Sequence, residues 1–285
     1  MRIDLHAHSA VSDGTDSPAQ FAAAAVRAGL DVVALTDHDT FDGLPAALAA
    51  AADLGLRLLP GAEISTQLGG ASVHLLGYGC RVDEPELADE LDRIRRGRDS
   101  RVPGMLAALA GLGLPVDPET LARTRGDAPS IGRPHIADAL VELGYVADRR
   151  EAFDRYLADD GPAFVGRYAV ELGRGIDLVH AAGGVAVLAH PWGRGSRDVL
   201  DPDMIVRLVA EHGLDGIEVD HNDHDPATRL ELAELAGHLG LLATGSSDYH
   251  GTGKSDHPLG ANTTDPQVLA EIEARIAAGG GWDGR

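Results

Sequence analysis

Histidines and carboxylates recur in short clusters along this chain, and each cluster adjoins an apolar run typical of a β-strand. Imidazole and carboxylate are the ligands that divalent metals such as zinc and manganese prefer. A barrel gathers the ends of its strands onto one face, so clusters that are distant in the sequence can meet there. The pattern indicates a multinuclear metal hydrolase. The clusters are His6-Ala7-His8 with Asp13, Thr36-Asp37-His38-Asp39, Glu63 with His74, Ala189-His190-Pro191 and Ser247-Asp248-Tyr249-His250.

Each cluster also has an ordinary structural explanation when it is taken alone. Alternate residues of an extended chain point the same way, but a surface pair of histidines has the same spacing as His6-Ala7-His8. Asp13 is typical of a turn, and the residues around His38 could cap a helix. An unpaired Glu63 would be costly to bury, whereas His74 could be a hydrogen-bonded core imidazole. Because all these clusters follow or lie in predicted strands, metal binding is the better explanation of the set.

Composition and charge are those of a globular enzyme. The 285 residues are 44% hydrophobic and 24% charged, which suits one α/β barrel or two smaller domains. Cys80 is the only cysteine, so an internal disulfide is excluded and metals must be held by histidine and carboxylate. The net charge of -21 argues against broad binding to nucleic acid or anionic membranes. Without a signal-peptide pattern or a membrane-spanning apolar run, we expect a cytoplasmic location.

Strand and helix patterns alternate in the first part of the chain. Residues 3–5 predict a strand, and Ser17 predicts an N-cap followed by Pro18 and a helix that stops at Gly29. This alternation favours parallel strands with helices packed outside them. Further strands are expected at 32–35, 58–63 and 73–78, and a helix at 44–54.

The pattern changes between residues 83 and 166, where charged helical segments replace the strands. We interpret this segment as a helical insertion that forms a lid or substrate domain. It interrupts a barrel catalytic domain made of residues 1–82 and 167–285. The glycines at 279–281 are expected to fray. After the insertion, strands are predicted at 185–189, 216–219 and 241–244, with helices near 204–212 and 227–239.

Longer motifs surround the candidate ligands. They are Asp4-Leu5-His6-Ala7-His8-Ser9 with Asp13-Gly14, Leu35-Thr36-Asp37-His38-Asp39, Pro60-Gly61-Ala62-Glu63, Ala189-His190-Pro191 and Gly245-Ser246-Ser247-Asp248-Tyr249-His250-Gly251. They resemble the PHP (polymerase and histidinol phosphatase) superfamily of metal-dependent phosphoesterases over nearly the whole chain. Within the insertion, Ile131-Gly132-Arg133-Pro134-His135-Ile136-Ala137 resembles the bacterial branch whose members are 3′,5′-nucleoside bisphosphate phosphatases or degrade very short RNA.

The resemblance implies a distorted seven-stranded (β/α) barrel and a site for two to three divalent ions, which would be manganese, zinc or iron. Clustered ions can acidify a water, orient phosphate oxygens and neutralise a leaving oxygen. Glu63 would bridge two of the ions. By motif position, His6, His8, Glu63 and Asp248 would hold one metal, Glu63, His74 and His190 a second, and Asp13, His38 and His250 a third.

Substrate contacts are expected from residues outside the metal ligands. Arg133 is the first candidate for a phosphate, because a guanidinium matches phosphate oxygens and its glycine and proline neighbours suggest a fixed turn. An ordinary surface arginine is the alternative. Arg98 and Arg101 are further candidates, with solvated charge as an equally good explanation. His135 could contact substrate or cap a helix.

His224 follows the strand predicted at 216–219, where the resembled branch tends to carry a histidine. It could contact phosphate or protonate the leaving group, so we group it with Glu63 and Asp248 as catalytic. The intervening Asp220-His221-Asn222-Asp223 departs from the aromatic and proline residues expected in that branch. The remaining histidines are interpreted as helix or surface residues; they are His180, His212, His238 and His257.

The ligand set and the resemblance together predict a hydrolase of small nucleotides. The favoured reaction removes the 3′-phosphate of a nucleoside 3′,5′-bisphosphate by attack of a metal-bound hydroxide. The alternative is a phosphodiesterase or 5′-3′ exonuclease acting on short oligonucleotides or cyclic phosphates. A non-catalytic metal-binding module is a third possibility, which the filled ligand positions disfavour. We expect neither a membrane partner nor a stable complex with long nucleic acid.

Overall fold

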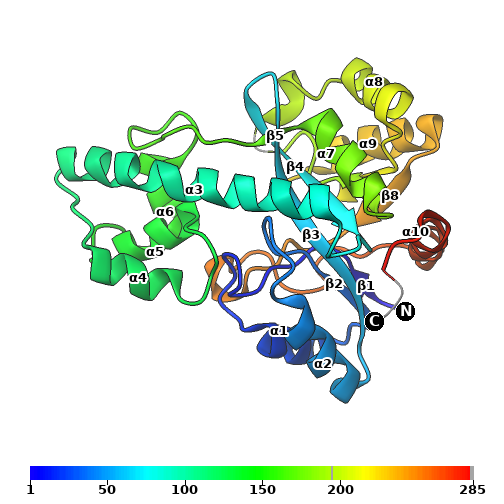
Figure 1. Ribbon diagram of the computed structural model, residues 1–285, viewed down its shortest axis with the longest axis horizontal. Helices are drawn as coiled ribbons and strands as arrows, with labels where there is room; N and C mark the ends of the chain where they lie inside the picture. Colours follow the sequence, from blue (N-terminus) through cyan, green and yellow to red (C-terminus); the bar gives the residue numbers. More distant parts are fainter. Residues whose placement is uncertain (194, 283–285) are drawn as a thin grey trace.

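A barrel-like sheet positions the candidate ligands. The computed structural model describes residues 1–193 and 195–282 (Figure 1). Within them, seven strands follow one another in the order β1-β2-β3-β4-β6-β7-β8. A short strand, β5 (Val170–Glu171), pairs with β3 beside this path. The seven strands are β1 (Ile3–Asp4), β2 (Val32–Leu35), β3 (Arg57–Leu68), β4 (Ala71–Tyr78), β6 (Val185–Leu188), β7 (Gly216–Asp220) and β8 (Leu242–Gly245).

Strand β4 breaks the parallel pattern. Strands β1 to β3 and β6 to β8 pair parallel, but β4 runs antiparallel to both β3 and β6. The expectation of uniformly parallel strands is therefore wrong at β4. Only Gly69 and Gly70 connect β3 to β4, with φ angles of 58° and 86°. Two residues suffice for a hairpin but not for the crossover that a parallel pair requires.

The two ends of the sheet meet just beyond β1 and β8. Ala7 forms an isolated bridge with Tyr249, and the amide of His8 donates to the Tyr249 carbonyl at 2.8 Å. The sheet is thus nearly closed, and the predicted distorted seven-stranded α/β barrel is confirmed. The closure also places the residues after β1 beside those after β8.

Helices surround the sheet and begin largely as predicted. Ser17 accepts a hydrogen bond from the Gln20 amide while the Gln20 side chain bonds back to Ser17, which confirms the N-cap. Gly55 ends the second helix with a φ of 67°. No helix in the described part of the chain is both long and apolar enough to cross a membrane. The helices are α1 (Pro18–Arg27), α2 (Leu44–Leu54), α7 (Leu172–Ala181), α8 (Pro202–His212), α9 (Pro226–Leu239) and α10 (Pro266–Gly279).

Helix α10 was not predicted, and it changes the interpretation of the glycine-rich tail. Leu269, Ile272 and Ile276 of α10 pack in the same apolar cluster as inward-facing strand residues. Gly280 ends the helix with a φ of 68°, and the next amides are hydrogen-bonded to Ile276 and Gly79. The expectation that residues 279–281 fray is wrong, because these glycines form a helix end packed on the barrel.

Residues 83–166 contain helices and no strand, as predicted. Helix α3 (Pro85–Gly111) reaches from the barrel to a group of shorter helices at its far end (Figure 1). These have their own apolar core with the second half of α3, whereas the first half packs in the barrel core. On this basis we propose that 83–166 is an insertion domain. The shorter elements are α4 (Pro118–Arg125), α5 (Arg133–Glu142), α6 (Arg149–Ala152) and the turn η1 (Phe153–Leu157).

Asp215 connects three elements of the barrel. Its carboxylate accepts hydrogen bonds from the Ala186 amide in β6 at 2.9 Å, from His180 in α7 at 2.8 Å and from Arg275 in α10 at 2.9 Å. Burial alone would raise the pKa of Asp215, but these partners hold it below its usual value. A carboxylate whose pKa is lowered by folding stabilises the protein above its unfolded pKa of about 3.9, and this contribution is lost as the pH falls.

We predict that Asp215→Asn lowers the free energy of unfolding at pH 7 by about 1–3 kcal/mol, because the amide cannot pair with Arg275 as a carboxylate does. The difference from the natural protein should persist from pH 7 to about pH 5 and shrink as the pH falls below about 4, because the carboxylate is then protonated first in the unfolded and then in the folded protein. Urea unfolding at several pH values measures both effects, with Asp160→Asn as an exposed control. A difference that does not change with pH would contradict the ion-pair explanation.

Candidate metal centre

The candidate ligands meet at one edge of the barrel. His6, His8 and Asp13 follow β1, and His38 follows β2 and forms a bridge with Glu63 of β3. His190 follows β6, and Asp248 and His250 follow β8. His74 lies early in its strand, where the sequence made it the least certain ligand. Because β4 is antiparallel, its beginning lies at the edge where the parallel strands end, and His74 pairs with Ser65 there.

Four side chains converge on one point, those of His6, His8, Glu63 and Asp248. The Nε2 atoms of His6 and His8 are 3.2 Å apart. Glu63 Oε2 lies 3.4 and 3.1 Å from these nitrogens, and Asp248 Oδ1 lies 3.5 and 3.4 Å from them. Ligands at about 2.0–2.2 Å from a tetrahedral ion are about 3.3–3.6 Å apart. One divalent ion therefore fits among His6, His8 and Asp248, whose ligand atoms all lie within 4.8 Å of one another, and Glu63 Oε2 lies beside both imidazoles.

The two oxygens of Glu63 face different groups of ligands. Oε2 faces His6 and His8, whereas Oε1 lies 2.7 Å from Nδ1 of His74 and 3.2 Å from Nε2 of His190. The rings of His74 and His190 meet edge to face, with centroids 5.4 Å apart. A carboxylate with one oxygen in each group has the geometry that a bridge between two ions requires.

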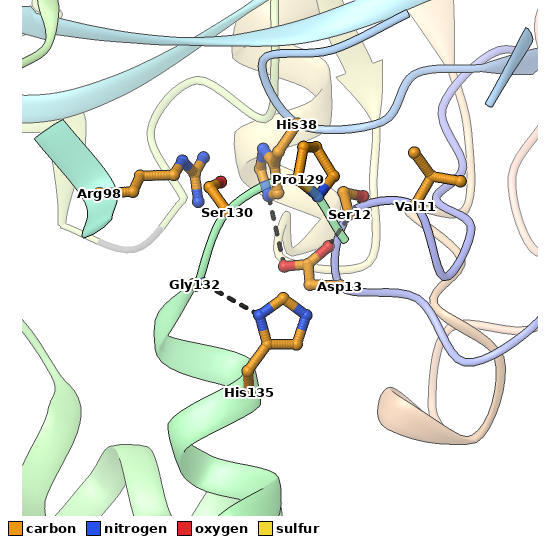
Figure 2. Close-up of a pocket in the computed structure, with 9 residues that line it drawn as sticks. All are labelled: Val11, Ser12, Asp13, His38, Arg98, Pro129, Ser130, Gly132 and His135. Atoms are coloured by element: carbon orange, nitrogen blue, oxygen red, sulfur yellow. Dashed lines mark hydrogen bonds and ion pairs between the residues drawn. The ribbon is translucent and has the colours of Figure 1, made fainter. Parts of the chain in front are cut away.

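A third group lies on the side that faces the insertion. Asp13 Oδ2 is 3.5 Å from Nε2 of His38 (Figure 2). Asp13 Oδ1 is 3.3 Å from Nε2 of His250. His8 joins this group as well, since its Nδ1 lies 3.7 Å from Asp13 Oδ1. The structure thus brings together all nine metal ligands predicted from the sequence, in groups that share His8 and Glu63.

Two buried nitrogens indicate that these side chains are arranged around a ligand. Nδ1 of His38 lies 3.1 Å from Glu63 Oε2 and Nδ1 of His74 lies 2.7 Å from Oε1, yet neither contact has hydrogen-bond geometry. A buried polar atom without a hydrogen bond costs about 1–3 kcal/mol. Coordination to a shared metal would satisfy such nitrogens, and a set of only nitrogen and oxygen ligands suits zinc, manganese or iron.

The site is strongly charged. Burial alone would lower the pKa of His6 and His8, but Glu63 and Asp248 reverse the effect, raising the pKa of His8 to about 9 and that of His6 well above its usual value. Burial would raise the pKa of Glu63, but the imidazoles around it hold that pKa well below its usual value. A divalent cation bound here would replace protons as the counter-charge of the carboxylates.

Sequence reasoning missed residues that support the ligands. Glu218 is fully buried in β7; its Oε1 lies 3.3 Å from Nδ1 of His6, and its Oε2 accepts the His190 amide at 2.8 Å. Lys254 Nζ lies 2.6 Å from Oδ2 of Asp248. A glutamate inside an apolar strand was the available sequence signal for Glu218, because a buried carboxylate needs partners.

A second group of histidines lies beside the ligands. His221 Nδ1 accepts the Asp223 amide at 3.0 Å, so in neutral His221 the proton is on Nε2, which lies 3.5 Å from Asp248 Oδ2. His224 donates from Nδ1 to the Val219 carbonyl at 2.8 Å, and its Nε2 is buried without a hydrogen bond in the described structure. The His221 and His224 rings are 5.7 Å apart between centroids.

The interpretation of His257 as a helix or surface residue is wrong, since it lies in a loop and is 6% exposed. Its ring is 5.9 Å from that of His221 between centroids. Local sequence could not reveal this burial, which comes from packing between separate loops. The other three histidines lie in helices as predicted, in α7, α8 and α9; they are His180, His212 and His238.

The candidate substrate residues of the insertion lie in different environments. Arg98 donates to Asp39 at 2.8 Å and to Ser65 at 2.7 Å, so it holds the loop after His38. His135 accepts the Gly132 amide at 3.0 Å and caps its helix. Both residues line a small pocket that also includes Asp13 and His38 (Figure 2). Its enclosed volume is about 10 Å³, room for a single water.

Arg133 and Arg101 are placed differently from each other. Arg133 does not line that small pocket; it pairs with Asp159, donates to the Leu157 carbonyl at 2.9 Å and lies near two phenylalanine rings. Arg101 is 6% exposed and makes no hydrogen bond or ion pair with any described residue. Burial and the positive charges of Arg98, Arg167 and Arg133 lower the pKa of Arg101 to about 8.

The chain is similar to known proteins over most of its length. Residues 4–100 match the PHP domain family. The chain is 35% identical to a 3′,5′-nucleoside bisphosphate phosphatase from Chromobacterium violaceum, over 96% of this chain and 97% of that protein. It is 33% identical to a 5′-3′ exoribonuclease from Haemophilus influenzae, over 87% of this chain and 90% of that protein. A Bifidobacterium adolescentis structure described as a metal-dependent phosphoesterase superposes with a TM-score of 0.91 at 34% identity, covering 96% of each chain.

We predict that Glu63→Gln lowers the number of ions bound per chain, because a neutral amide is a poorer ligand and cannot balance two cations. Elemental analysis after loading with manganese or zinc and desalting measures the loss. Glu211→Gln, on an exposed position of α8, serves as the control and should keep the full metal content. Unchanged metal content in Glu63→Gln would rule out the bridge.

Proposed function

The chain belongs to the PHP family of metal-dependent phosphoesterases, and from this premise we propose that it removes the 3′-phosphate from nucleoside 3′,5′-bisphosphates. The observation that carries the choice of substrate is an arginine cluster, in which Arg98 and Arg101 are buried and Arg133 and Arg167 are partly buried beside them. It adjoins the candidate metal centre through Arg98, which lines one pocket with Asp13. A substrate with two phosphates could place one at the metals and the other at the arginines.

The arginine cluster is unusual in a chain with a net charge of -21. Burial and the charge of Arg98 lower the pKa of Arg167 to about 9, as happens also at Arg101. Buried like charges are costly unless an anion compensates them. A phosphate accepts several charge-assisted hydrogen bonds and would satisfy the unpaired guanidinium of Arg101. We therefore place Arg101 ahead of Arg133, whose side chain already pairs with Asp159.

The reacting phosphate is proposed to bind at the metal centre. Two to three manganese, zinc or iron ions would be held by the nine ligands, and when bound they would acidify a water and neutralise phosphoryl oxygens. Glu218 and Lys254 hold His6 and Asp248 in place. His224 is proposed to serve the leaving oxygen, because its buried Nε2 is available to exchange a proton once Nδ1 is fixed on Val219.

Short RNA is the second candidate substrate, and one feature favours it. A hollow of about 280 Å³ adjoins the small pocket through His135 and is lined by Thr15, Arg125 and Arg149 among other residues. A phosphodiester would need such space for the nucleotide beyond the cleaved bond. Both substrates would use the same metals. The lengths of substrate that the protein hydrolyses efficiently therefore distinguish the phosphatase from the exonuclease.

We predict that Arg101→Met lowers kcat/KM for a nucleoside 3′,5′-bisphosphate by roughly tenfold to a hundredfold, since a charge-assisted hydrogen bond is worth about 1.5–3 kcal/mol. Activity on an aryl monophosphate, which has no second phosphate, should change little. Arg96→Met is the control, because Arg96 lies on the same helix with a side chain that is 70% exposed. Equal losses on both substrates would place Arg101 at the reacting phosphate or in structural support.

We also predict that catalytic efficiency falls steeply from bisphosphate to dinucleotide to longer RNA at low salt, because the acidic protein repels a long polyanion. Added salt should reduce this penalty by screening. Defined 5′-phosphorylated oligomers of increasing length provide the test. If long RNA is cleaved as efficiently as the bisphosphate, the exonuclease assignment replaces the phosphatase.

A further inference from the structure

Arg149 begins helix α6 in the insertion, but its side chain reaches the barrel. Nε and Nη2 each lie 2.6 Å from one oxygen of Asp138 in α5, so the pair is bidentate. Nη1 donates to the backbone carbonyl of Asp13 at 2.9 Å. The side chain is 13% exposed, which distinguishes it from a solvated surface pair. The insertion thus fixes two nitrogens of the guanidinium. The third nitrogen binds the loop that carries Asp13, a candidate metal ligand.

The same guanidinium packs against the loop that follows His250. A Cβ atom at Gly253 would lie 2.7 Å from Cζ of Arg149, so this close approach requires glycine. The two loops are also bonded to each other. The amide of Thr15 donates to the His250 carbonyl at 3.2 Å, and the amide of Thr252 donates to Thr15 Oγ1 at 2.9 Å. Arg149 therefore touches both loops that supply Asp13 and His250.

A contact to the Asp13 carbonyl can affect the position of Asp13 itself. It belongs to the peptide bond that precedes Gly14, and the Gly14 amide of the same peptide donates to the Ser9 carbonyl at 3.0 Å. A Cβ at Gly14 would lie 2.8 Å from the carbonyl carbon of His8, so a stiffer residue cannot take its place. The barrel thus holds the amide side of this peptide and Arg149 of the insertion holds its carbonyl side, so the two contacts together orient the backbone that carries the Asp13 carboxylate. His135 of the insertion lines one pocket with Ser12 and Asp13 of this loop.

We propose that Arg149 is a positioning residue that couples docking of the insertion to ion binding at Asp13, His38 and His250. The inference rests on the proposed metal centre. It extends that centre by giving the insertion a direct role in forming one of the ion sites. Loss of the arginine releases the Asp13 loop, while the ligands around Glu63 keep their own contacts. The other ion sites are therefore unaffected.

The test compares Arg149→Met with Arg150→Met, a matched control whose side chain is 86% exposed in the natural protein. Manganese titration by calorimetry gives the number of ions and the affinity of each, and amide hydrogen exchange follows residues 118–157. For Arg149→Met we expect one ion to bind roughly tenfold to a hundredfold more weakly, as is typical when a residue that orients a metal ligand is removed. The same protein should show faster exchange in α5 and α6.

Asp138→Asn changes the carboxylate partner of Arg149 instead of Arg149 itself. It provides a second test of the coupling if Arg149→Met folds poorly. It keeps the arginine but weakens its anchor, so it should weaken the same ion and leave the others unchanged. Unaltered ion number, affinities and exchange in both variants would overturn the role of Arg149 while leaving the metal centre intact. Absence of manganese and zinc binding in the natural protein would overturn the metal centre and this inference together.

Discussion

The burial of Glu63 constrains the rest of the site. A carboxylate enclosed in a barrel is costly unless opposite charge reaches it, and imidazoles from several strands lie within 3.4 Å of its two oxygens. Three residues around this point have positive φ angles, 56° at Asp39, 31° at His190 and 53° at Asp248. Such conformations cost on the order of 1–3 kcal/mol each and persist where surrounding contacts enforce them. The strand ends are thus shaped by the need to surround one carboxylate.

Strand β4 and the insertion both depart from a regular barrel, and both help to form the site around Glu63. The antiparallel β4 returns through two glycines and brings His74 to Glu63 Oε1, a position that a parallel strand would reach only at its far end. The insertion contributes from the opposite side, because Arg98 holds Asp39 and Arg149 holds the Asp13 carbonyl. The barrel and the insertion therefore both contribute to the site, and the insertion carries Arg101, the arginine proposed first for the second phosphate.

Local sequence patterns predicted much of the fold and of the candidate site. The helix at Leu44–Leu54 and the Ser17 cap followed from proline, glycine and capping patterns, and the ligands followed from histidine and carboxylate clusters at strand ends. The direction of β4 was missed although Gly69 and Gly70 signalled a hairpin. Glu218, His221 and His257 were missed or misjudged because contacts between distant segments bury them. The sequence around Arg133 suggested a fixed turn, but Arg133 is the first residue of helix α5, and the sequence could not show which way its guanidinium points.

The central claim is that Glu63 lies between two ions, one on each oxygen. Crystals of the manganese-loaded protein, measured for anomalous scattering near the manganese edge, test it most directly. The account predicts one peak beside Oε2 among His6, His8 and Asp248, and another beside Oε1 next to His74 and His190. A single peak away from Glu63, or a peak on only one of its oxygens at full occupancy, would contradict it.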